Sequence, residues 1–116
     1  NLIKQRGNDF SGSYTDDGSR QVVSNFRTSK FFFLQKQEHA QIRRIEQRAA
    51  DLLGAPVDEV EPLQVVSYTK GARFDLHHDA GCLNVETGRV EITDPRRIAT
   101  IFVYLNTLPF GFGQTE

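Results

Sequence analysis

The spacing of apolar residues predicts one amphipathic helix in the first half of the chain. Within 37–53 the apolar positions recur at three- and four-residue steps: Ile42, Ile45, Ala49 and Leu52. Arg, Glu and Gln residues separate them, so the apolar side chains share one face of an α-helix of about four turns. Gly54 and Pro56 predict where the helix ends, because glycine favours the C-terminal cap and proline cannot continue a helix.

Shorter apolar runs on either side of this helix predict β-strands. Three consecutive phenylalanines at 31–33 precede it, and LQVVSY at 63–68 follows it. The stretch RFDLHHD at 73–79 is expected to be extended, whereas 80–95 has the glycine, asparagine and proline content of a loop. The strongest strand candidate is RRIATIFVYLN at 96–106. Both of its alternating faces are largely apolar, which predicts that both are covered.

The remaining composition narrows the class of protein. Residues 1–25 are polar and rich in glycine, serine and aspartate, as in a loop or an irregular arm. The order of arm, strand, helix and further strands predicts a β-sandwich or barrel with a helix packed outside it. A net charge of -1 gives no electrostatic reason to expect a nucleic-acid or membrane-surface partner. No apolar run approaches the roughly 18 residues of a transmembrane helix.

The numbers of cysteine and methionine residues bear on the cellular compartment and on the extent of the chain. The single cysteine, Cys82, excludes an internal disulfide and leaves the cellular compartment open. The 116 residues include no methionine, so we expect the chain to be a piece of a longer protein.

Candidate chemistry gathers where two of the three histidines are adjacent, at His77 and His78. On a strand, residues two apart point the same way, so His77 and Asp79 share a face and His78 lies on the other. An imidazole nitrogen and a carboxylate oxygen are two of the three ligands of a 2-His-1-carboxylate metal site, which leaves positions open for substrates and oxygen. The short H-x-D pattern alone equally fits a solvent-exposed polar turn.

The sequence around this pattern resembles the prolyl 4-hydroxylase family of iron(II)- and 2-oxoglutarate-dependent dioxygenases. The stretch 61–79 carries the family's order of Y-x-x-G, an aromatic residue and H-x-D: Tyr68, Gly71, Phe74, His77 and Asp79. The segment 96–106 resembles the family's R-I-A-T-x-x-x-Y-L strand, and GFGQTE at 111–116 resembles the glycine-rich turn after it. RTS at 27–29, ahead of the helix, also fits. These blocks cover most of 27–116.

The resemblance implies a fold and a division of the chain. The fold would be mainly β with an N-terminal helix (α+β), a double-stranded β-helix or cupin-like jelly-roll that is incomplete at its C-terminus. Residues 1–25 would be a polar arm or irregular segment, and 26–116 would be part of the catalytic domain. The second histidine ligand and the basic residue that pairs with 2-oxoglutarate would lie beyond Glu116, so this piece alone is expected to be inactive.

The resemblance also implies roles for particular residues. His77 and Asp79 would bind Fe(2+), and three residues would line the 2-oxoglutarate pocket: Tyr68, Thr100 and Tyr104. A hydroxyl suits the pocket because it donates a hydrogen bond to a carboxylate. On generic grounds the two tyrosines are equally barrel aromatics, and Thr100 is a common strand residue. His39 is expected to be a surface residue of the helix.

The implied reaction hydroxylates an unactivated C–H bond, most specifically C4 of a peptidyl proline, as in a procollagen-proline 4-dioxygenase. Succinate and CO2 would be co-products, and ascorbate would serve as reductant. The substrate would be a proline-containing peptide or protein, with no nucleic acid and no membrane segment, and the endoplasmic reticulum or secretory pathway is a compartment that fits the family. Two alternatives stay open: a non-catalytic jelly-roll binding module, or the same chemistry on a nucleobase or small molecule.

Overall fold

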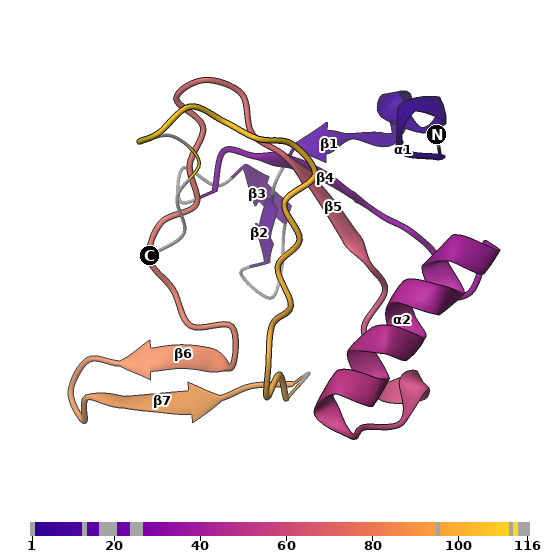
Figure 1. Cartoon of the computed structure of the whole chain (residues 1–116). Helices are drawn as coiled ribbons and strands as arrows, with labels where there is room; N and C mark the ends of the chain where they lie inside the picture. Colours follow the sequence, from indigo (N-terminus) through magenta and orange to yellow (C-terminus); the bar gives the residue numbers. More distant parts are fainter. Residues whose placement is uncertain are drawn as a thin grey trace. The chain divides into compact units, whose positions relative to one another are not determined.

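The computed structural model describes residues 2–12, 14–16, 21–23, 27–94, 96–111 and 113. They form two compact units, Asn1–Leu76 and His77–Glu116 (Figure 1). In the described part of the chain, strands pair only in antiparallel fashion, in one three-stranded and two two-stranded sheets, and the longest helix has 14 residues. The predicted mixture of β-structure with a helix is thereby confirmed, and the jelly-roll stays a prediction.

The first unit is built on a three-stranded sheet. Its central strand β4 (Lys30–Phe33) runs between β1 (Ser11–Gly12) and β5 (Gln64–Ser67), as Figure 1 shows. The register places Phe32 opposite Val65. Both predicted strands, at 31–33 and 63–68, are therefore confirmed.

Strand alternation decides which phenylalanine of β4 enters the core. Phe32 is 5% exposed and packs with Leu34, Ile42 and Val65. Phe31 and Phe33 point to the opposite face, where their rings meet edge to face at 5.5 Å. Phe33 is therefore largely exposed, although it belongs to the apolar run that predicted the strand.

The predicted helix is present as α2 (Ala40–Leu53), and both of its ends are capped. At its N-terminus the Nδ1 atom of His39 accepts a hydrogen bond from the Gln41 backbone N–H at 3.2 Å. At its C-terminus Gly54 adopts a left-handed φ of 63°, which glycine tolerates without steric cost. The helix begins later than the predicted residue 37, because His39 is its cap rather than a member.

The buried face of α2 differs from the predicted one. The buried residues are Ile42, Glu46 and Ala50, which follow a strict four-residue step. Ile45 and Leu52, predicted to be buried, are 49% and 75% exposed. The described residues thus cover only part of the apolar face of α2. Glu46 is fully buried, and neither of its carboxylate oxygens has a hydrogen-bond partner among the described residues.

The polar N-terminal segment contains regular structure where it is described. α1 (Leu2–Gln5) and the 3-10 helix η1 (Gly7–Asp9) precede β1, and β2 (Tyr14–Asp16) pairs with β3 (Gln21–Val23). Other parts of the predicted arm lie outside the described residues, and its separation from a domain at 26–116 stays a prediction. A second 3-10 helix, η2 (Val57–Glu59), follows α2.

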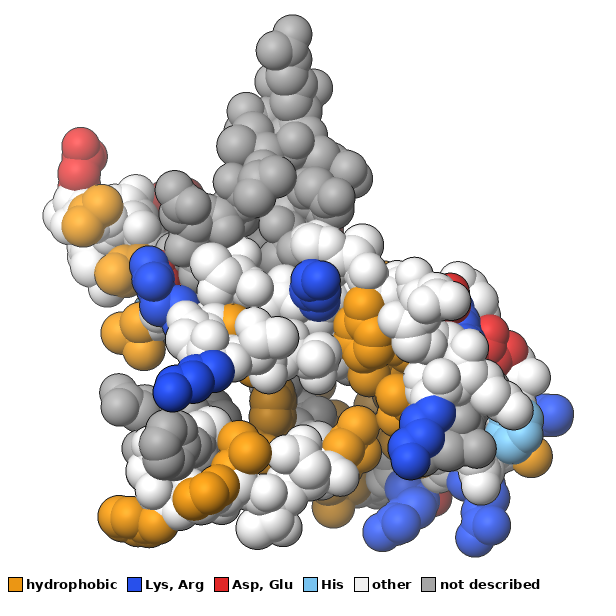
Figure 2. Space-filling view, turned by 90° about the horizontal axis from the view of Figure 1, so that it is seen from above, with side chains coloured by type: hydrophobic (Ala, Val, Ile, Leu, Met, Phe, Trp, Pro, Cys, Tyr) orange, Lys and Arg blue, Asp and Glu red, His pale blue; other side chains and the backbone are white. Residues whose placement is uncertain are grey.

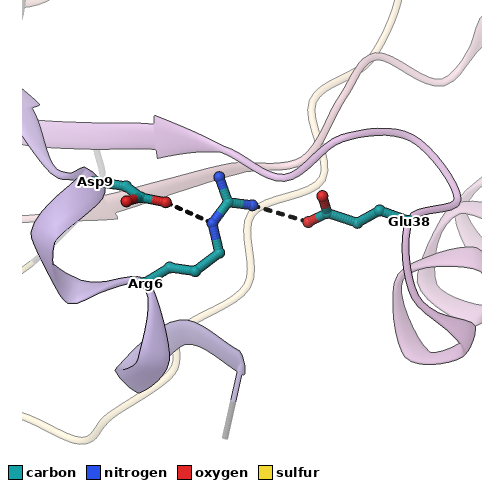
Figure 3. A network of polar contacts seen from close by, with 3 residues as sticks. All are labelled: Arg6, Asp9 and Glu38. Atoms are coloured by element: carbon teal, nitrogen blue, oxygen red, sulfur yellow. Dashed lines mark hydrogen bonds and ion pairs between the residues drawn. The ribbon is translucent and has the colours of Figure 1, made fainter.

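An ion-pair network joins this segment to the start of α2 (Figure 3). The Arg6 guanidinium lies 2.6 Å from an Asp9 oxygen through Nε and 2.9 Å from a Glu38 oxygen through Nη1. The Asp9 hydrogen bond, together with the charges of both carboxylates, raises the pKa of Arg6 above its ordinary value. The guanidinium also lies over the Phe32 ring at 5.2 Å, so it covers one edge of the core.

The second unit contains a hairpin where a loop was predicted. β6 (Gly81–Asn84) pairs with β7 (Arg89–Ile92), which corrects the expectation for 80–95. The Asn84 side-chain oxygen accepts from the backbone N–H groups of Glu86 and Thr87, and Gly88 takes a φ of 66°. These turn interactions explain why glycine and asparagine, read as loop residues, instead close a hairpin.

Two predicted strands are wrong in the described structure. The stretch 73–79 has only isolated bridges, at Phe74 and His78, and 96–106 forms no strand. Ile98 is 87% exposed, and the apolar side chains after it also face solvent. A strand requires a ladder of backbone hydrogen bonds to a second strand, and no such ladder forms at 96–106 among the described residues. Apolar side chains also reach the surface at several places on the face drawn in Figure 2.

None of the described helices has the length and apolar character needed to cross a membrane.

Candidate metal centre

The second unit brings together the two residues of the H-x-D pattern. His77 Nε2 lies 3.1 Å from Asp79 Oδ1, and both side chains are partly exposed. The predicted reason was a shared strand face, but the local structure is a turn. The Gly81 N–H donates to the His78 carbonyl at 3.4 Å, and His78 forms an isolated bridge with Gly81. Asp79 lies within this turn and His77 directly precedes it, so the two residues are close without a paired strand.

Thr100 contacts the same carboxylate from a distant part of the sequence. Its hydroxyl donates to Asp79 Oδ2 at 2.5 Å, across 21 residues of chain. Each oxygen of Asp79 thus has a partner, His77 on one and Thr100 on the other. This contact was missed by sequence reasoning, which placed Thr100 only at a cosubstrate pocket. No local pattern signals a contact between residues so far apart in the chain.

The donor set fits two neighbouring positions on a divalent metal. Bonds from a divalent metal to imidazole nitrogen or carboxylate oxygen are about 2.1 Å, so two ligands at right angles lie about 3 Å apart. The 3.1 Å between His77 Nε2 and Asp79 Oδ1 is close to that separation, and it is equally an ordinary distance for an imidazole N–H that donates to a carboxylate. Within the described ranges no cluster of three or more His, Cys, Asp or Glu residues is placed to hold a metal. The residues present therefore fit part of a metal site.

The hairpin holds the turn that follows the two candidate ligands. A Cβ atom at Gly81 would lie 2.8 Å from the Glu91 carbonyl carbon and 2.9 Å from Ile92 Cα, closer than real Cβ atoms approach backbone. Only glycine lets β7 come this near. Ala80 also accepts a hydrogen bond from the Thr93 N–H at 3.2 Å. The backbone just after Asp79 is therefore tied to β7.

The other histidines have different places. His78 is exposed, and its backbone takes part in the bridge to Gly81. His39 is exposed and caps α2, in keeping with its expected surface position. Cys82, three residues after Asp79, is exposed on β6.

The two tyrosines predicted to line a cosubstrate pocket are both exposed. The Tyr104 ring meets Phe102 edge to face at 5.1 Å, in the segment that was expected to be a strand. Because that segment is not paired in a sheet, no sheet face is shared by Thr100 and Tyr104. Tyr68 follows β5 in the first unit. The roles of all three residues stay predictions, and the GFGQTE motif lies largely outside the described residues.

Comparison with known proteins extends these observations. No family model matches the chain. Probable prolyl 4-hydroxylase 8 of Arabidopsis thaliana is 34% identical over 98 residues, which are 83% of this chain and 31% of the relative. Probable prolyl 4-hydroxylase 10 of the same plant is 35% identical over 92 residues, 79% of this chain and 30% of the relative. Prolyl 4-hydroxylase subunit alpha-1 of Gallus gallus is 32% identical over 90 residues, 78% of this chain and 17% of the relative. The chain thus spans less than a third of the length of these relatives.

Proposed function

Because the chain matches a fragment of the prolyl 4-hydroxylase family, we propose that it forms part of the active site of an iron(II)- and 2-oxoglutarate-dependent dioxygenase. His77 and Asp79 are the first two iron ligands in this proposal. The observation that carries it is the 3.1 Å approach of an imidazole nitrogen to a carboxylate oxygen within the H-x-D motif. A third ligand comes from chain beyond these residues.

Thr100 acts on the proposed site through Asp79. The Oδ2 atom of Asp79 accepts a hydrogen bond from the Thr100 hydroxyl, and the Oδ1 atom lies beside His77. In this proposal Asp79 binds the metal through Oδ1 alone. A hydrogen bond to a carboxylate that binds a metal orients the carboxylate and strengthens metal binding. In this proposal Thr100 orients Asp79 and also lies beside the cosubstrate. Tyr68 and Tyr104 supply hydroxyl donors to the 2-oxoglutarate carboxylates.

The bound iron, with 2-oxoglutarate and O2, supplies the oxidising chemistry that hydroxylates an unactivated C–H bond and releases succinate and CO2. The substrate we propose is a peptidyl proline, hydroxylated at C4, with ascorbate keeping the iron reduced. In this proposal 26–116 is one part of a jelly-roll domain. The exposed segment 96–106 becomes a strand when the rest of the domain pairs with it.

Metal binding to matched histidine variants tests the assignment. Titration of the full-length protein with Fe(2+) under anaerobic conditions should give one tight site. His77→Ala should abolish it, because it removes a proposed ligand, and His78→Ala should leave the affinity within about threefold, the size of an ordinary surface substitution. Succinate release with proline-rich peptides should follow the same order. Equal loss from the two variants contradicts the ligand assignment. Iron binding without peptide-dependent succinate release removes the prolyl substrate, and absence of any iron site favours a non-catalytic binding module.

A further inference from the structure

The residue that caps the start of α2 has a side chain that gains and loses a proton near neutral pH. His39 has the extended backbone of an N-cap residue, and its carbonyl accepts the first helical hydrogen bond, from the Arg43 N–H at 3.1 Å. Its Nδ1 atom accepts a hydrogen bond from the Gln41 N–H at 3.2 Å. Serine, threonine, asparagine and aspartate usually fill this position. Imidazole differs from all four because it changes its charge between about pH 5 and 8.

Only the neutral form of the His39 ring accepts this hydrogen bond. A ring nitrogen that accepts carries no proton, whereas both nitrogens of an imidazolium ion are donors. Protonation of Nδ1 therefore removes the bond to the Gln41 N–H. It also places a positive charge at a helix N-terminus, where the helix dipole disfavours it. Because the neutral form holds the helix, the stability from the cap is present at the upper end of the imidazole range and is lost as the pH falls.

The charged groups near His39 leave a positive charge on its ring without a partner in the described structure. The first turn of α2 contains no acidic residue, and Arg43, four residues after His39, is positive. The adjacent carboxylate, Glu38, is paired with Arg6 at 2.9 Å. The Lys36 ammonium donates to backbone carbonyls of η2. None of the ion pairs among the described residues includes His39.

Imidazole is also the group in this region that ordinarily titrates between about pH 5 and 8. Carboxylates, lysine and arginine ordinarily keep their charge over this range. The other charged residues of the neighbouring elements η1 and η2 are all carboxylates: Asp9, Asp58 and Glu59. A change at the start of α2 over this range therefore reports on His39.

The first turn of α2 leads directly to the core of the first unit. Ile42, three residues after the cap, is 2% exposed and packs with Phe32, Leu34 and Val65. When the cap is lost, the backbone N–H groups of this turn lose a hydrogen-bond partner and open to solvent more often. The loosened turn contains the residue that anchors α2 to the sheet.

We propose that His39 is a pH-sensitive cap, which holds the first turn of α2 when its ring is neutral and releases that turn when its ring is protonated. The proton is the only ligand that this switch requires. The switch lies within the first compact unit and is independent of the proposed iron site. It makes the start of α2 less stable in mildly acidic surroundings.

Two variants of the full-length protein separate capping from titration. His39→Asn keeps a cap acceptor that does not titrate, whereas His39→Ala removes the acceptor at every pH. NMR measures the protection factor of the Gln41 N–H, which is the intrinsic exchange rate divided by the observed rate at each pH. From pH 8 to pH 5 we expect this factor to fall about tenfold in the unaltered protein, about fivefold from the lost cap and about twofold from the added charge.

The variants should behave differently from the unaltered protein. His39→Asn should change by less than about twofold over the same range, and His39→Ala should already be about fivefold less protected than the unaltered protein at pH 8. The other histidines are present in all three proteins, so the comparison removes their contribution. In the unaltered protein the pH midpoint of the fall should coincide with the midpoint at which the His39 ring signals shift.

Three outcomes overturn the proposal. One is a fall in protection that is equal in His39→Asn and in the unaltered protein. Another is full protection of the Gln41 N–H in His39→Ala at pH 8. The last is a midpoint that differs from that of the His39 ring, since another group is then responsible. Should His39→Ala not fold, as judged by far-UV circular dichroism, the comparison of His39→Asn with the unaltered protein still decides.

Discussion

Replacing Arg27 by lysine keeps the positive charge and removes the planar guanidinium, which makes four contacts within the first unit. The guanidinium lies over two aromatic rings, at 4.8 Å from Phe31 and 4.7 Å from Phe74. It also donates to the Ser29 hydroxyl at 3.0 Å and to the Gln64 side-chain oxygen at 3.1 Å. A lysine ammonium is compact and cannot lie flat between two rings while reaching two acceptors. We therefore expect Arg27→Lys to destabilise this unit.

The magnitude follows from which contacts the lysine loses. One cation–π contact at a partly exposed site is worth about 0.5–1 kcal/mol, and one hydrogen bond contributes about 1 kcal/mol net. If lysine retains one ring contact and one hydrogen bond, the loss is about 2 kcal/mol. Ser29 is buried, where a hydrogen bond contributes more than at an exposed position, so this figure is a lower bound.

Urea unfolding followed by far-UV circular dichroism measures this loss. With a slope of about 2 kcal/mol per molar urea, the midpoint should fall by about 1 M at unchanged slope. Arg43→Lys is the matched control because Arg43 is exposed on α2, and its midpoint should move by less than the equivalent of about 0.5 kcal/mol. Equal midpoints for the two variants refute the reasoning, since they mean that the Arg27 guanidinium, lying over Phe31 and Phe74, contributes nothing to stability beyond its charge.

Three further substitutions test other parts of the structure. Gly81→Ala should destabilise the β6–β7 hairpin by about 1–3 kcal/mol, because its Cβ would overlap the backbone of β7; faster hydrogen exchange in 81–92 reports the effect, and unchanged exchange contradicts the close approach. Glu46→Met should raise the urea midpoint by about 1–3 kcal/mol equivalent, because it removes buried oxygens that lack partners among the described residues; a lower midpoint means that the carboxylate is bound in the whole protein. Thr100→Val should weaken Fe(2+) affinity of the full-length protein about tenfold and Thr100→Ser should not, whereas equal affinities mean that the hydroxyl does not orient Asp79.

Local features were predictable where neighbouring residues are enough to decide the structure. The end of α2 at Gly54 follows from glycine's access to left-handed φ, and β4 and β5 follow from short apolar runs. The closeness of His77 and Asp79 was also predicted, although from a strand that the structure does not have: His77 directly precedes a turn that contains Asp79.

Other features were mispredicted because the local pattern fits more than one arrangement. Asparagine and glycine in 84–88 fit a loop or a hairpin turn, and only the pairing of β6 with β7 chooses between them. The apolar residues of α2 do not show how much of their helix face is covered. Ile45 belongs to the predicted apolar face but is exposed, whereas Glu46 is buried. The segment 96–106 has the composition of a strand and lacks a described neighbour to pair with.

The sequence by itself determined the C-terminal end of α2, the two strands beside it and the H-x-D motif with its likeness to prolyl 4-hydroxylases, because these depend on residues close together in the chain. Tertiary structure alone decided that Thr100 donates to Asp79 and that Thr28 holds Arg73, contacts that span 21 and 45 residues. It also decided that Phe32, and not its neighbours in the run, enters the core. Contacts between distant residues depend on how the backbone returns to itself, and that path is set by packing and strand pairing over the whole unit rather than by local preference.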